Sequence, residues 1–143
     1  MTQVGFYLLK DIEPQRIQHT ACRLIDKAYR QGLGVYVHAA SPEGVAEIDQ
    51  LLWTFRQGSF VPHVALARED GVSPVLVGCA AEPPARLSDV LVNLSDQIPL
   101  FFSRFERVVE IIGATETLRA AGRERYRFYR DRGYPLQTHT LAA

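Results

Sequence analysis

The sequence predicts an α/β fold in which a mostly parallel five-stranded sheet is covered by helices on both faces, giving a three-layer α/β/α domain. Short apolar runs alternate with helical segments along the chain, as crossover connections between parallel strands require. Several of the apolar runs are continuous, which is typical of strands buried on both faces. The 143 residues are 47% apolar and contain no internal repeat or linker. We therefore expect a single domain spanning 1–143.

The first part of the chain predicts two strands, each followed by a helix. An apolar run with aromatic residues favours a strand at 4–9. Apolar residues then recur at three- and four-residue steps over 14–31, which predicts a helix that ends at a glycine. A buried strand is expected at 35–39. Ser41-Pro42 is a typical helix start, so a second helix is expected over 41–53.

The second part begins with a loop and then resumes the alternation of strands and helices. By the same criteria we expect strands at 75–79, 89–94 and 107–112, a short helix over 95–105 and a long terminal helix over 115–132. Numbering the five strands along the chain, the expected order in the sheet is 3-2-1-4-5. The last residues, which include His139, are expected to be a loose tail.

The overall charge is balanced, but it is distributed unevenly. Sixteen basic residues offset sixteen acidic ones, which argues against a long-range preference for nucleic acid or membranes. Leu33 to Ser103 nevertheless carries a net charge of −5, and Arg119 to Arg132 carries +4. No signal peptide and no apolar stretch long enough for a membrane span are found. Cys22 and Cys79 lack a partner spacing and predict buried free thiols in the cytoplasm.

The fold resembles nucleotide-binding α/β domains, yet it lacks the glycine-rich phosphate loop. The chain after the first strand, Lys10 to Pro14, contains no glycine. His19 and Cys22, three residues apart on one helix, could form a nucleophile and its base, but no third group that would orient them is evident. We therefore expect no catalytic residues, no cofactor and no metal. A small nucleotide-binding enzyme is retained as an alternative.

The terminal helix carries an arginine stripe. Helical spacing places five side chains on one face: Arg119, Arg123, Tyr126, Arg127 and Arg130. The guanidinium groups repel one another, with only Glu124 and Asp131 expected near enough to compensate, and a carboxylate or phosphate partner would relieve this repulsion. A solvated helix face, an acidic peptide ligand and single-stranded nucleic acid are all compatible with the stripe.

A second candidate surface lies between the end of one helix and the following loop. It comprises Trp53, Phe60, Val61 and Pro62. These residues either pack in the core or present an aromatic anchor to a partner protein, since aromatic side chains dominate interface energetics.

Taken together, these segments resemble the chi subunit family of bacterial DNA polymerase III. The resemblance is carried by Phe6-Tyr7-Leu8-Leu9, by Leu52-Trp53 followed by Ser59-Phe60-Val61-Pro62-His63, and by Arg123-Glu124-Arg125-Tyr126 with Tyr129-Arg130. It covers almost the whole chain. It implies a nucleotide-binding-like fold without nucleotide chemistry, in a non-catalytic accessory subunit of the clamp loader.

The resemblance also implies two partners. One is the acidic C-terminal tail of single-stranded DNA-binding protein, which ends in a phenylalanine carboxylate. Arg123, Tyr126 and Arg127, with Arg119 beside them, are implied to hold this tail, and Ile112 could line the pocket for the phenylalanine. The psi subunit is the second implied partner, on the face of Trp53 and Phe60. No direct DNA binding and no membrane association are expected. Direct single-stranded nucleic-acid binding by the same helix is the alternative.

Overall fold

The computed structural model describes residues 1–58, 60–79 and 82–141. Ser59, which belongs to one of the motifs above, lies outside the described residues. The regular elements follow one another in the order β1 (Gln3–Leu9), α1 (Arg16–Arg30), β2 (Val35–His38), α2 (Pro42–Thr54), β3 (His63–Ala65), β4 (Val75–Gly78), β5 (Val90–Asn93), β6 (Arg107–Ile112), α3 (Glu116–Asp131) and β7 (Leu136–Leu141). Short 3-10 turns lie at Leu66–Arg68 and Phe102–Arg104.

All strands join one parallel sheet, with the order β3-β4-β2-β5-β6-β1-β7. The α/β class and the parallel sheet are therefore confirmed, but the sheet has seven strands, not five. The expected strand order was wrong, because the first strand lies between β6 and β7 and not at the centre. The tail was also misjudged, since the residues up to Leu141 form the edge strand β7 and pair with β1.

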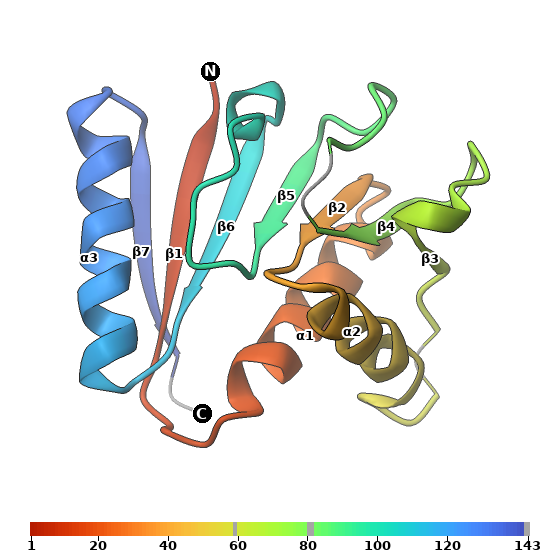
Figure 1. The fold of residues 1–143 in the computed structure, drawn as a ribbon, viewed down its shortest axis with the longest axis horizontal. Coiled ribbons are helices and arrows are strands. Elements are labelled where there is room, and N and C mark those ends of the chain that lie inside the picture. The colour runs from red at the N-terminus through yellow and green to blue at the C-terminus, as the bar shows by residue number, and fades with distance from the viewer. Residues whose placement is uncertain (59, 80–81, 142–143) are drawn as a thin grey trace.

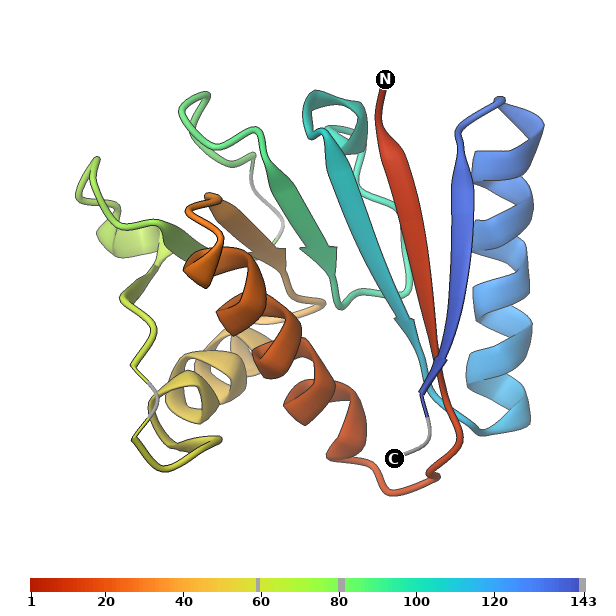
Figure 2. The same cartoon turned by 180° about the vertical axis from the view of Figure 1, so that it is seen from behind.

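The two faces of the sheet carry separate apolar clusters. On one face, α1 and α2 pack against β2, β4, β5 and β6 through residues that include Ile25, Leu52 and Val77. On the other, α3 and the chain before β6 pack through Phe6, Phe102 and Tyr129. Figures 1 and 2 show α3 running along β7 at one end of the molecule, with α1 and α2 below the other half. The sheet is thus the middle of three layers.

Local capping explains where α2 and α3 begin. The hydroxyl of Ser41 accepts a hydrogen bond from the Gly44 N–H at 3.1 Å, and the hydroxyl of Thr115 accepts one from the Leu118 N–H at 3.3 Å. The helix expected over 95–105 is reduced to the turn at Phe102–Arg104. No helix among the described residues combines the length and apolarity needed to span a bilayer.

Candidate functional site

Helix α3 packs closely against strand β6 at Gly122. Gly122 and Tyr129 are its buried residues. A Cβ added at Gly122 would lie only 2.8 Å from the Cδ1 atom of Ile112. Glycine therefore permits a close approach between helix and sheet that a larger residue would oppose.

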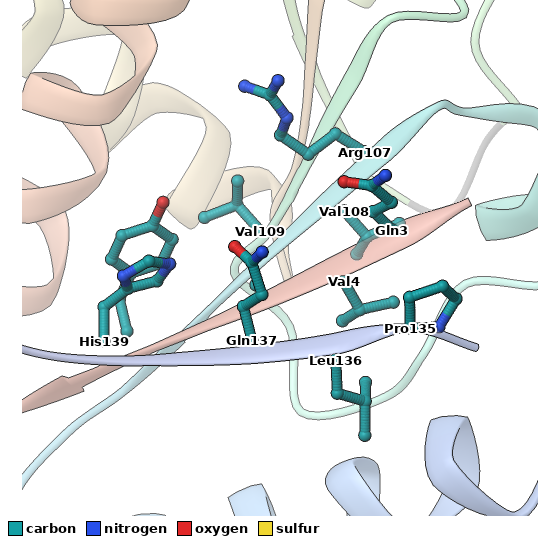
Figure 3. Close-up of a pocket in the computed structure, with 11 residues that line it drawn as sticks. Gln3, Val4, Arg107, Val108, Val109, Pro135, Leu136, Gln137 and His139 are labelled. Atoms are coloured by element: carbon teal, nitrogen blue, oxygen red, sulfur yellow. The ribbon is translucent and has the colours of Figure 1, made fainter. Parts of the chain in front are cut away.

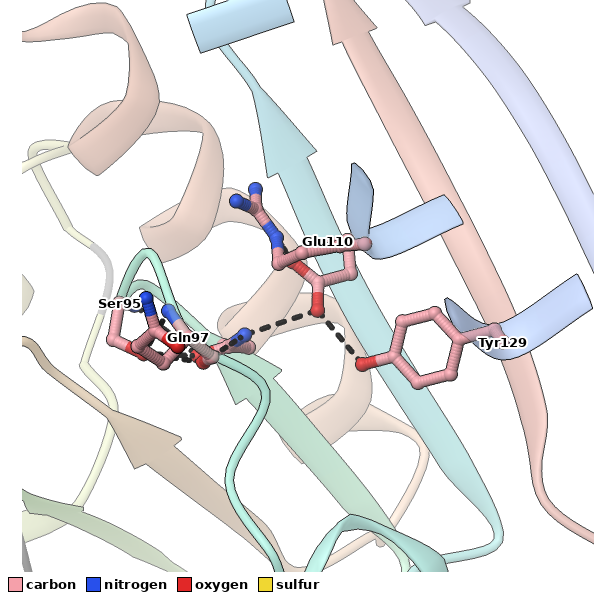
Figure 4. Close-up of polar contacts among 6 residues, drawn as sticks. Ser95, Gln97, Glu110 and Tyr129 are labelled. Atoms are coloured by element: carbon pink, nitrogen blue, oxygen red, sulfur yellow. Dashed lines mark hydrogen bonds and ion pairs between the residues drawn. The ribbon is translucent and has the colours of Figure 1, made fainter. Parts of the chain in front are cut away.

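A buried polar cluster also ties α3 to the sheet. The carboxylate of Glu110, on β6, accepts hydrogen bonds from the Tyr129 hydroxyl at 2.8 Å, the Asn93 amide at 3.0 Å and the Arg125 Nε at 2.9 Å. Figure 4 shows Glu110 between Tyr129 and the loop that carries Ser95 and Gln97. Burial raises the pKa of Glu110, while the charge of Arg125 and the three hydrogen bonds act in the opposite direction. With its donors satisfied, the cluster fixes the position of α3 on the sheet.

A pocket of about 310 Å³ opens between α3 and the strands beneath it. Strand β1 contributes Phe6 and Leu8, β6 contributes Ile112, and the edge strand β7 contributes Thr138. The wall formed by α3 consists of Arg119, Gly122, Arg123 and Tyr126. The pocket therefore has an apolar floor and a basic rim.

The pocket brings together Arg119, Arg123, Tyr126 and Ile112 from the predicted site, but Arg127 and Arg130 lie outside its lining. Sequence reasoning missed the floor residues Phe6, Leu8 and Thr138. Their contribution depends on the pairing of β1 with β7, which no local pattern indicates.

Each arginine of the stripe already has a partner within the chain. Arg119 donates to the Leu9 carbonyl at 2.8 Å, and Arg123 donates to the Glu116 carboxylate at 2.9 Å. Arg127 pairs with Glu124, and Arg130 pairs with Asp131. The expectation that only Glu124 and Asp131 compensate the stripe was wrong, because Glu116 reaches across two turns to Arg123. These three ion pairs are largely exposed, so each is worth little and can be exchanged for a ligand.

The second candidate surface is partly exposed. Trp53 is 46% exposed and Phe60 is 61% exposed, and their ring centroids lie 5.5 Å apart. Trp53 also rests on His63, at 4.3 Å between ring centroids. Val61 was grouped with this surface but is fully buried in the core, because the chain turns its side chain inward before β3. Pro62 is half-buried. The free part of this surface is therefore Trp53 and Phe60.

Another pocket, of about 350 Å³, lies at the strands β1, β6 and β7. Figure 3 shows Gln3, Arg107 and Gln137 projecting to one side of the strands and Leu136 to the other. His139 stacks on Tyr7 at 4.7 Å between ring centroids. This pocket was not predicted, because it depends on β7.

The candidate catalytic pair does not have the properties of an activated nucleophile. Cys22 is fully buried, and burial raises the pKa of its thiol to about 12. The thiolate form is therefore scarce at neutral pH. Among the described residues, no group of three or more histidine, cysteine or acidic side chains could hold a metal ion.

Comparison with known proteins identifies the family. The model of the family described as "DNA polymerase III chi subunit, HolC" matches residues 1–137. The chain belongs to the DNA polymerase III chi subunit family. The resemblance drawn from the sequence motifs is thus confirmed, and the family places the chain among proteins of DNA replication.

Three relatives are named DNA polymerase III subunit chi. The protein from Pseudomonas aeruginosa is 44% identical over 141 residues, covering 99% of this chain and 98% of the relative. The protein from Escherichia coli is 28% identical over 146 residues, covering 98% and 99% respectively. The protein from Haemophilus influenzae is 27% identical over 137 residues, covering 95% of each chain. Each match therefore covers 95% or more of this chain.

Proposed function

We propose that this chain is a non-catalytic accessory subunit of the replicative polymerase in the cytoplasm. It binds the acidic C-terminal tail of single-stranded DNA-binding protein in the pocket beside α3. The observation that carries the proposal is the composition of this pocket, whose apolar floor adjoins two guanidinium groups. A peptide that ends in a phenylalanine carboxylate offers the complementary pair, an aromatic ring and an anion.

The roles of the residues follow from their positions in the pocket. The ring of the terminal phenylalanine packs on Phe6, Leu8 and Ile112, while its carboxylate lies toward Arg119 and Arg123. Arginine suits this anion because its planar fork donates two parallel hydrogen bonds. The pocket volume of about 310 Å³ lies at the lower end of the range for small-ligand sites. It therefore accepts the end of a chain better than a larger compact ligand.

The remaining arginines have a secondary role. Arg127 and Arg130 lie outside the pocket lining and are exposed. They add long-range attraction for the acidic residues that precede the anchored end. Removing either one should weaken binding less than removing Arg123.

The test is a titration with a synthetic peptide that is rich in aspartate and ends in phenylalanine. We expect a dissociation constant in the micromolar range, equivalent to about −8 kcal/mol. Arg123→Ala should weaken binding roughly tenfold or more, because charged hydrogen bonds contribute about 1.5–3 kcal/mol. Arg107→Ala is the matched control, since Arg107 is exposed and lines a different pocket. Equal affinity of the wild type and Arg123→Ala would refute the assignment.

Two further arms of the titration separate the alternatives. Affinity for the peptide should fall as salt rises, because the rim charges are screened. A single-stranded oligonucleotide at the same salt concentration should bind much more weakly than the peptide. Oligonucleotide binding that equals peptide binding and depends on Arg123 would favour the nucleic-acid alternative.

The exposed pair Trp53 and Phe60 supports a second partner, the psi subunit, through which the chain would connect to the clamp loader. Two adjacent aromatic side chains that remain exposed are typical anchors of a protein interface. Phe60→Ala should weaken psi binding by about 2 kcal/mol or more without changing affinity for the acidic peptide. Undiminished psi binding by Phe60→Ala and Trp53→Ala would refute this part of the proposal.

A further inference from the structure

Strand β7 has an outer edge on which no described strand pairs. It is the last strand of the sheet and pairs only with β1, through six consecutive residue pairs. The Val4 N–H donates to the Pro135 carbonyl at 3.0 Å. Since successive residues of a strand point their backbone groups to opposite sides, those of Gln137 and His139 face β1. The N–H and C=O groups of Leu136, Thr138 and Thr140 therefore face the open edge.

This edge lacks the features that usually prevent strand addition. Within Leu136–Leu141 there is no lysine, no carboxylate and no proline, and the unbroken register with β1 leaves no bulge. The four central residues are exposed. Natural proteins usually block such edges with charges, prolines or bulges. An unblocked, regular edge is the arrangement that accepts an extended peptide as an added strand.

The open edge is continuous with the pocket beside α3. Thr138 lines that pocket, and its backbone groups face the edge. A chain whose end is held in the pocket can therefore leave it alongside β7. The nearby rim of Arg119 and Arg123 is basic, and β7 itself has no acidic residue. This charge pattern favours an acidic segment over a basic one.

We infer that the residues preceding the anchored end of the acidic tail add to β7 as an eighth strand, an inference that rests on the proposed function. Their backbone groups bond to Leu136, Thr138 and Thr140. At about 3.3 Å per residue, the six residues of β7 provide an edge of about 20 Å. Backbone pairing gives affinity that depends little on which acidic side chains the tail carries.

Peptide backbone methylation tests this geometry on the wild-type protein. A series of peptides, each N-methylated at one position, is titrated against the chain. A methyl group on an N–H that pairs with β7 removes one hydrogen bond, so methylation at alternate positions should weaken binding about two- to tenfold. The intervening positions, whose N–H groups face solvent, serve as controls and should bind normally. Tight binding with no alternation along the series would overturn the added strand.

A pair of protein variants gives an independent test. Thr138→Pro removes an outward N–H without removing a bond to β1, whereas Thr138→Ala keeps the N–H. The proline variant should bind the peptide about two- to tenfold more weakly than the alanine variant, with both melting curves recorded to confirm folding. Hydrogen exchange at Leu136, Thr138 and Thr140 should slow when peptide binds. If the peptide binds in an Arg123-dependent manner but exchange does not slow, the added strand is refuted while the proposed function stands. If the peptide does not bind at all, the proposed function itself is refuted.

Discussion

Gly122→Ala should destabilise the protein, although the same change in an ordinary helix stabilises it. Alanine gains about 1 kcal/mol over glycine in a helix interior. Here the new Cβ would lie 2.8, 2.9 and 3.1 Å from three side-chain carbons of Ile112. Ile112 is β-branched and only 3% exposed, so it cannot easily rotate away. Overpacking of this kind costs about 1–3 kcal/mol. The net loss of unfolding free energy is therefore up to about 2 kcal/mol.

Urea unfolding measures this loss directly, provided that the free energy of unfolding depends on urea concentration with the same slope in the wild type and the variant. The same substitution should be neutral or stabilising in an Ile112→Ala background, because all three crowded carbons are then absent. The resulting double-mutant cycle should give a coupling of about 1–3 kcal/mol. Peptide affinity should also fall in Gly122→Ala, since both residues line the pocket. A gain of about 1 kcal/mol in stability, with unchanged affinity, would refute the argument.

Three further predictions concern charged and titratable groups. Glu116→Gln removes the negative charge that pairs with Arg123 and should tighten peptide binding about two- to fivefold in a titration, given the small value of exposed pairs. Weaker binding would contradict this prediction. Glu110→Gln leaves the largely buried guanidinium of Arg125 without its compensating negative charge and should cost about 3 kcal/mol in urea unfolding. A cost near zero would contradict the role of the cluster. Burial lowers the pKa of His38 in the folded protein. As the pH drops below about 6.5, the histidine is therefore protonated in the unfolded chain before it is protonated in the folded one. The free energy of unfolding should consequently fall from about pH 6.5 down to the lower folded pKa. Melting temperatures across this range should show a shallower fall in His38→Gln, and an equal fall would exclude His38 as the cause.

The sequence predicted the strands that are continuous apolar runs, but it did not predict the two edge strands. Strand β3 has three residues and directly follows Pro62, so it is too short for any periodicity. Strand β7 reads Leu-Gln-Thr-His-Thr-Leu, which has no apolar face. Its conformation is determined by pairing with β1, a contact between the two ends of the chain. The strand order failed for the same reason, since local patterns do not encode which strands become neighbours.

The site was predicted only where one helix supplies it. Helical spacing identified Arg119, Arg123 and Tyr126, which do line one pocket. The floor of that pocket comes from strands that are distant in sequence, and spacing on α3 cannot reveal it. Glu110 could have been noticed as the only charged residue inside the apolar run 108–112. A buried carboxylate at such a position requires partners, and three donors surround it.

The order of strands in the sheet also sets a distance. Strand β7 and the pocket beside α3 lie at one edge, while β3, whose His63 supports Trp53, forms the other edge. With neighbouring strands about 4.8 Å apart, the two edges are separated by about 30 Å. Ligands at the two edges would not touch, so one can dissociate while the other stays bound. The domain would then act as a rigid spacer, which keeps a released ligand at high local concentration and favours its return.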